Sequence, residues 1–122
     1  MIYLASPYSH PDSEVREQRF RDACYAAVTI MRMRQPVFSP IAHGHCLCGY
    51  GLPTNWSFWE PFDRTQIERC DEVVVLMLDG WQQSVGVQAE IRIAAECGKP
   101  VRYFAPDGMG QNNVPIGSKG AS

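Results

Sequence analysis

The stretch DEVVVLML, residues 71–78, decides how this sequence folds. After two acidic residues it runs without interruption through six apolar side chains, Val73 to Leu78. A strand with one solvated face would alternate apolar and polar residues, whereas a continuous run is typical of a central parallel strand buried on both faces. We therefore expect a parallel sheet that is covered by helices on both sides.

The sequence around this strand alternates between extended and helical patterns. Further short apolar runs predict strands within residues 1–5, 36–40 and 99–105. Helical spacing predicts helices within residues 10–34, 58–70 (beginning near Pro61) and 85–98, the last closed by Gly98. This alternation predicts an α/β fold, a flavodoxin/Rossmann-like three-layer sandwich with a parallel sheet of four to five strands in the order of about 2-1-3-4.

We expect one domain over residues 1–105. Residues 106–122 are poor in apolar side chains and rich in glycine, and we expect them to form a tail that is flexible or ordered only against a partner. Residues 41–57 contain Gly, His, Cys and Trp, and we interpret them as a long functional loop.

Composition excludes several classes of function. The net charge is −2 and the basic residues are dispersed, which argues against a nucleic-acid polymer as partner. No apolar run approaches the roughly 18–20 residues of a membrane span, and the start lacks the basic region of a signal peptide. We therefore expect no membrane partner. The five cysteines form no disulfide pattern, which predicts a reducing cytoplasm.

Parallel sheets bind ligands beyond the carboxyl ends of their strands. In this sequence those ends are Ala5–Tyr8, Ser39–His43 and Leu78–Ser84, where polar and aromatic residues gather. The candidate ligand-binding residues at these ends are Ser6, Tyr8, His43 and Trp81. Of the three tryptophans, Trp56, Trp59 and Trp81, any could stack on a planar base or could instead serve packing.

The start of the helix at 85–98 favours an anion. Ser84 is a good N-cap, Gly86 allows close approach to the backbone, and a helix N-terminus attracts negative charge. Glu90 lies about one and a half turns further on, where it could act as nucleophile, base or acceptor from a sugar hydroxyl. From spacing alone, a capping interaction or a salt bridge explains Glu90 equally well. Asp63 is expected in a first helical turn, where an aspartate usually just complements the positive end of the helix dipole.

The segment HGHCLC, residues 43–48, raises a zinc site as an alternative, because four potential ligands lie within six residues. It lacks paired CxxC spacing and a second cysteine knuckle. There is also no GxxxxGK[ST] loop and no GxGxxG after the first strand, which disfavours ATP hydrolysis and dinucleotide binding.

Three segments together resemble the nucleoside 2-deoxyribosyltransferase superfamily, including its nucleoside 5′-monophosphate N-glycosidase branch. They are IYLASPY (2–8), FDRTQIERCDEVVVLML (62–78) and SVGVQAEIRIAAECGKPV (84–101), and the resemblance extends over about residues 1–104. Two features depart from the family pattern: Arg92, after Ile91, stands where the family usually has glycine, and the long 41–57 loop is not typical. Position 84 separates the branches, because the nucleoside transferases have an aspartate there and this chain has Ser84.

The resemblance implies a set of functional residues. Glu90 matches the family's nucleophile, Asp63 the aspartate that assists the leaving base, and Tyr3 the tyrosine that hydrogen-bonds near the nucleophile. Ser84 matches the monophosphate hydrolases, since an aspartate would repel a phosphate. The implied substrate is a nucleotide or nucleoside.

The resemblance further implies a homodimer or higher homo-oligomer and no cofactor, with a polar residue of the neighbouring subunit's tail completing the site. Asn112, Asn113 and Ser118 are candidates for that residue. The alternatives to an N-glycosidase or 2-deoxyribosyltransferase are a non-catalytic nucleotide-binding module and a zinc-binding protein.

Overall fold

The structure is a computed structural model that describes residues 1–106 of the 122-residue chain. Its strands are β1 (Ile2–Ala5), β2 (Val37–Phe38), β3 (Glu72–Leu76) and β4 (Val101–Phe104). Its helices are α1 (Ser13–Arg32), α2 (Pro40–Cys48), α3 (Trp56–Arg69) and α4 (Val85–Glu96), with a 3₁₀ turn, η1 (Trp81–Gln83). None of the helices within residues 1–106 is both long enough and apolar enough to span a membrane.

The four strands form one parallel sheet in the order β2-β1-β3-β4, which confirms the predicted α/β class and strand order. The two central strands pair over four residues, from Ile2 with Glu72 to Ala5 with Val75. As predicted, Val73 to Leu76 are fully buried. The order reverses between β1 and β3, so this is the point at which a doubly wound sheet opens a crevice at its carboxyl edge.

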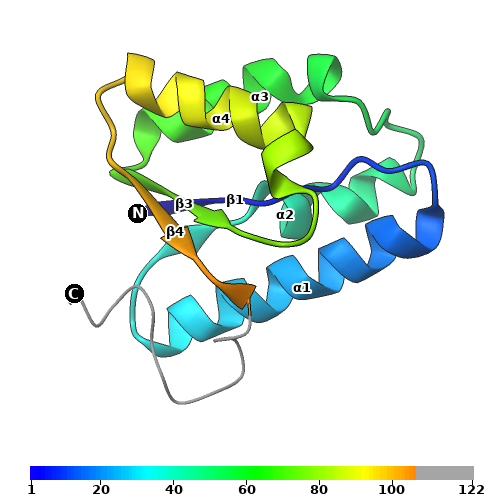
Figure 1. The fold of residues 1–122 in the computed structure, drawn as a ribbon, viewed down its shortest axis with the longest axis horizontal. Coiled ribbons are helices and arrows are strands. Elements are labelled where there is room, and N and C mark those ends of the chain that lie inside the picture. Colours follow the sequence, from blue (N-terminus) through cyan, green and yellow to red (C-terminus); the bar gives the residue numbers. More distant parts are fainter. Residues whose placement is uncertain (107–122) are drawn as a thin grey trace.

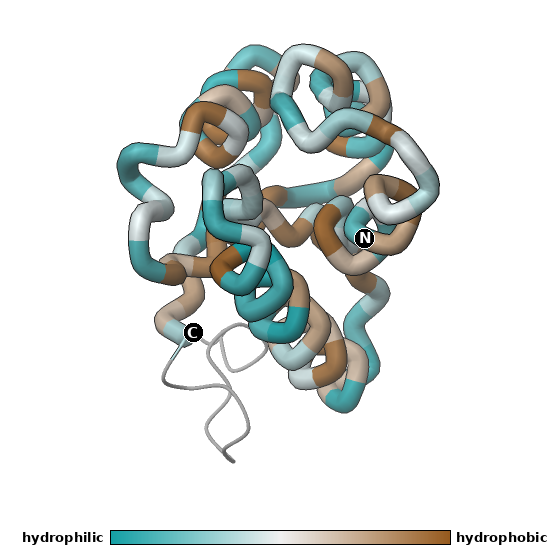
Figure 2. The backbone as a smooth tube through the Cα atoms, turned by 90° about the vertical axis from the view of Figure 1, so that its right-hand side faces the viewer, coloured by the Kyte–Doolittle hydropathy of each residue, from teal (hydrophilic) through white to brown (hydrophobic). Residues whose placement is uncertain are grey.

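The sheet separates two apolar cores, as the three layers in Figure 1 show: α1 covers one face, and α3 and α4 lie together over the other. Because side chains alternate along a strand, Leu4 packs toward α1 whereas Tyr3 packs toward α3 and α4. Apolar and polar residues also alternate along the helical turns in Figure 2, as expected for helices that bury one side. Tyr3 therefore has no exposed surface even though it carries a hydroxyl.

Local sequence explains where the helices begin and end. Asp12, Ser39 and Ser84 are the N-caps of α1, α2 and α4, and each side-chain oxygen accepts a hydrogen bond from a backbone N–H of the first turn. As predicted, Gly98 follows the last residues of α4, with a φ of 71° that suits glycine.

The prediction of a long loop over residues 41–57 is wrong, because its first part is the helix α2. The Ser39-Pro40 pair starts this helix, since serine caps the first turn and proline is tolerated there. Gly44 within the helix is compatible with close packing: a Cβ added there would lie 3.2 Å from Cη2 of Trp59. The irregular connection is therefore confined to residues 49–55.

The predicted start of the next helix near Pro61 is also wrong. Helix α3 begins at Trp56, five residues earlier, and Pro61 lies inside it. A proline in a helix removes one backbone hydrogen bond, which normally favours a boundary at that point. Here the aromatic side chains of the first turns pack on one another, with ring centroids 5.2 Å apart for Phe58 and Trp59, and this packing accompanies a helix that continues through Pro61.

Candidate active site

A cavity of about 530 Å³ opens where the sequence places the ligand cleft, beyond the carboxyl end of β1. Its lining comes from the segment after β1, from α2, from residues 54–59 and from the start of α4. A volume of this size suits a small molecule of the dimensions of a nucleotide.

Three buried polar side chains from three different elements lie at the inner end of this cavity, where two carboxyl groups line it and a tyrosine lies behind one of them. Glu90 of α4 is 4% exposed and Asp63 of α3 is 7% exposed, and both line the cavity. From β1, the hydroxyl of the fully buried Tyr3 donates a hydrogen bond to Oε2 of Glu90. Glu90 lies 27 positions after Asp63 in the chain and 87 positions after Tyr3. The parallel sheet and its crossover helices thus bring these distant residues into one site.

Burial shifts the pKa values of these groups. Loss of solvent raises the pKa of Asp63 from 3.8 to about 7; a hydrogen bond with Tyr3 acts in the opposite direction, and the Glu60 charge adds to the rise. Loss of solvent also holds the pKa of Glu90 well above its usual range, opposed by the Tyr3 hydrogen bond and reinforced by the Asp63 charge. Near neutral pH, Asp63 can therefore both hold and release a proton, as a general acid must.

Tyr3 remains a hydrogen-bond donor under these conditions. Loss of solvent and the charges of Glu90 and Asp63 hold the Tyr3 pKa well above its usual value, so the phenol stays neutral. A neutral hydroxyl that donates to Glu90 stabilises the ionised carboxylate more than the neutral acid. Tyr3 thus opposes the effect of burial on the pKa of the Glu90 carboxyl group.

The start of α4 forms another wall of the cavity. Ser84 Oγ accepts a hydrogen bond from the Val87 amide at 3.1 Å, so its own hydroxyl proton remains available to a ligand. Gly86 leaves room beside Trp56, whose Cε3 would lie 3.5 Å from an added Cβ. Ser6 is 5% exposed, and within the described residues its Oγ has no hydrogen-bond partner.

The structure brings most of the predicted residues together but not all of them. Ser6, Tyr8, Ser84 and Gly86 line the cavity with Glu90 and Asp63, and Tyr3 lies behind Glu90.

His43 and Trp81 are not among the residues that line this cavity, so their predicted role in ligand binding stays a prediction. His43 is exposed and packs near Phe38, because residues two apart on a helix point in nearly opposite directions and His45 takes the inward one. Trp81 packs on Tyr103, at a ring-centroid distance of 5.6 Å. Trp56 and Trp59 are the tryptophans that line the cavity.

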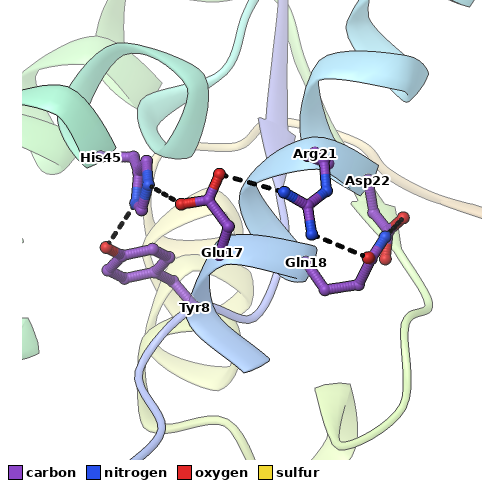
Figure 3. Close-up of polar contacts among 6 residues, drawn as sticks. All are labelled: Tyr8, Glu17, Gln18, Arg21, Asp22 and His45. Atoms are coloured by element: carbon purple, nitrogen blue, oxygen red, sulfur yellow. Dashed lines mark hydrogen bonds and ion pairs between the residues drawn. The ribbon is translucent and has the colours of Figure 1, made fainter. Parts of the chain in front are cut away.

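Sequence reasoning missed a hydrogen-bonded row beside the cavity, shown in Figure 3. The Tyr8 hydroxyl lies 2.7 Å from Nδ1 of His45, and Nε2 of His45 lies 2.9 Å from Oε1 of Glu17. Glu17 sits on α1, where the pattern indicates only a solvated polar face. No local signal connects it to a histidine 28 residues later.

The structure does not support the zinc alternative within residues 1–106, because no group of three His, Cys, Asp or Glu side chains there could hold a metal ion. Helix α2 separates the four candidates of residues 43–48: Cys46 is exposed, whereas His45 is engaged by Tyr8 and Glu17. The expected tail contributions of Asn112, Asn113 and Ser118 lie outside the described residues, as do all tail residues after 106.

Fold and site together define a Rossmann-like α/β domain with a buried carboxyl pair at the carboxyl edge of its sheet. The chain belongs to the DUF1937 family, a domain of unknown function, whose model matches residues 1–106. No curated protein matches the chain.

Proposed function

We propose that this protein cleaves the N-glycosidic bond of a nucleoside 5′-monophosphate, or transfers its sugar, through a covalent glycosyl intermediate on Glu90. The observation that carries the proposal is that Glu90 and Asp63 line one cavity and that the Tyr3 hydroxyl, behind them, donates a hydrogen bond to Glu90. The resemblance to the nucleoside 2-deoxyribosyltransferase superfamily assigns roles to the same three residues. Their grouping in space gives that resemblance a physical basis that spacing alone did not provide.

The chemistry is a double displacement at C1′ of the sugar. In the first step a carboxylate oxygen of Glu90 forms a bond to C1′ while the bond from C1′ to the base nitrogen breaks, and Asp63 gives its proton to the departing base. In the second step water, or the nitrogen of another base, attacks C1′ and releases Glu90, while Asp63 takes up the proton of the attacking group. No cofactor enters either step.

The wall at the start of α4 supports a 5′-phosphate as part of the substrate. The first N–H groups of a helix have no partner within the helix, and the positive end of the helix dipole favours an anion. Ser84 adds a hydroxyl proton, and Ser6 adds a buried oxygen that has no partner within residues 1–106. An aspartate at position 84 would place a negative charge beside the phosphate, whereas serine does not.

The test is a screen for release of free base from the common ribo- and deoxyribonucleotides and from the same compounds without the phosphate. We expect release from at least one 5′-monophosphate, and we expect Glu90→Gln to abolish it. Glu96→Gln is the matched control, since Glu96 also lies on α4 but is exposed. Faster cleavage of unphosphorylated nucleosides would overturn the assignment of the α4 wall to phosphate.

A non-catalytic nucleotide-binding module is the second candidate, and one observation favours it. The burial that raises the Glu90 pKa favours the neutral acid, which cannot attack C1′. If no base is released from any nucleotide while Glu90→Gln binds nucleotides as the wild type does, the protein is a non-catalytic nucleotide-binding module. The departure at Arg92 favours neither candidate, because its side chain is exposed on the outer side of α4.

The resemblance also implies self-association with a shared site, and this remains a prediction. Light scattering gives the mass in solution, and a monomeric mass together with base release would refute it.

A further inference from the structure

The hydrogen-bonded row Tyr8–His45–Glu17 lies beside the proposed chemistry without taking part in it. Tyr8 and His45 both line the cavity, whereas Glu17 approaches His45 from α1 (Figure 3). Phe20 stacks on the imidazole with a centroid distance of 4.3 Å and an interplanar angle of 22°, so the ring of His45 is held on its face as well as at both nitrogens. Such a fixed ring gives the Tyr8 hydroxyl a defined hydrogen-bond role.

The direction of the hydrogen bonds follows from the end of the row. Glu17 is ion-paired with Arg21 at 3.2 Å, and an ionised carboxylate only accepts hydrogen bonds. Nε2 of His45 therefore carries the proton, which leaves Nδ1 of a neutral ring as an acceptor. In this tautomer the Tyr8 hydroxyl donates to Nδ1, and burial raises the Tyr8 pKa, which keeps the group a phenol. The remaining capacity of the Tyr8 oxygen is to accept.

The position of Tyr8 in the cavity indicates which part of a nucleotide it would meet. The α4 wall with Ser84 and Gly86 is assigned to the phosphate and Glu90 to C1′ of the sugar. Tyr8 bonds to α2, which follows the edge strand β2, whereas α4 follows the central strand β3. With the phosphate assigned to α4 and the sugar to Glu90, we place the base on the α2 side of the same cavity, which Tyr8 and His45 line.

Resting on the proposed function, we infer that the Tyr8 oxygen determines base specificity by accepting a hydrogen bond from an exocyclic amino group of the base, with His45 and Glu17 as positioning residues. The class of ligand is a nucleotide whose base carries such an amino group, as adenine and cytosine do. A base that presents only a carbonyl or a C–H at that position leaves the Tyr8 oxygen without a donor. Burying an oxygen that has lost its partner weakens binding.

The test compares nucleotides that differ by the amino group alone. The two pairs are adenine against unsubstituted purine and cytosine against pyrimidin-2-one, each as the 5′-monophosphate and with the same sugar. Dissociation constants are measured by calorimetry at pH 8. We expect the amino compound of at least one pair to bind about tenfold more tightly, as one hydrogen bond allows.

Three variants separate a specificity role from a structural one. Tyr8→Phe should bring the ratio within that pair close to one, whereas Tyr25→Phe, at an exposed tyrosine on α1, should leave it unchanged. Glu17→Gln should reduce the ratio, because an amide can donate to Nε2 of His45 and allow the other tautomer, which turns the Tyr8 hydroxyl toward the ligand as a donor. A general loss of folding would weaken both members of a pair equally.

The outcomes distinguish this inference from the proposed function. Equal binding within both pairs, or an unchanged ratio in Tyr8→Phe, would overturn the inference even if base is released. A tenfold ratio that Tyr8→Phe removes would support it, even if no base is released and the proposed chemistry fails. If no nucleotide binds at all, both are wrong.

Discussion

Replacing Asp63 with asparagine should raise stability at neutral pH while it reduces the proposed activity. Asparagine keeps the shape of the side chain but removes its ionisation. The folded state raises the Asp63 pKa from 3.8 to about 7. The carboxyl group therefore stabilises the fold fully below about pH 4, and this contribution is lost as the pH rises through about 7.

The size of the effect follows from the pKa values. A tenfold change in proton affinity is worth about 1.4 kcal/mol, so the rise to about 7 corresponds to roughly 4 kcal/mol of pH-dependent stability. The variant has no such dependence at position 63. The Glu90 pKa should also fall, since the Asp63 charge is one cause of its elevation.

Urea unfolding between pH 4 and pH 8 measures this prediction. The free energy of unfolding of Asp63→Asn minus that of the wild type should increase by about 4 kcal/mol over this range, and the use of a pH-dependent difference cancels any fixed cost of the amide. The matched control is Asp79→Asn, at an exposed aspartate, for which the difference should stay nearly constant. A flat difference for Asp63→Asn would refute the raised pKa of this carboxyl. Base release should fall about 10²–10⁴-fold, the usual contribution of a general acid.

Tyr3→Phe removes the donor to Glu90, so the Glu90 pKa rises further, and the acidic limb of the pH–activity profile should move upward by about one to two pH units; an unmoved limb would show that Tyr3 does not stabilise the carboxylate. Ser84→Ala removes the N-cap of α4 and should lower the free energy of unfolding by about 1 kcal/mol in urea titrations. Ser84→Asp retains a cap, and it should shift preference in base-release assays from 5′-monophosphates toward unphosphorylated nucleosides; an unchanged preference would contradict the phosphate site. Gly44→Ala places a Cβ 3.2 Å from Trp59, which lines the cavity, so calorimetry should show weaker nucleotide binding; unchanged binding would show that the indole ring yields without altering the cavity.

The sequence predicts those parts of the fold that depend on regular patterns. The apolar run that begins at Val73 predicts a buried parallel strand without knowledge of its neighbours, and Gly98 marks a helix end through its own backbone preference. The start of α3 could not be predicted in this way. A proline at position 61 indicates a boundary locally, whereas packing among the aromatic residues around it involves side chains that no short window can evaluate.

The candidate site shows the same division. The family resemblance, and not spacing, predicts that Glu90 and Asp63 belong together, because alternatives such as capping remain open for each residue alone. The choice between His43 and His45 depends on whether residues 43–48 form a helix, and interpreting them as a loop removed the basis for that choice. The partnership of His45 with Glu17 depends on the packing of α1 against α2, which no local pattern encodes.

The cavity has two kinds of wall, and they leave different scope for evolutionary change. Tyr3 belongs at once to the apolar core and to the acidic centre, so most substitutions there would impair folding and chemistry together, and the position should resist drift. The residues that α2 contributes lie outside both core clusters. Under the proposed function, exchanges along this one helix would therefore change the molecule that the cavity accepts, while the Tyr3–Glu90–Asp63 group stays the same.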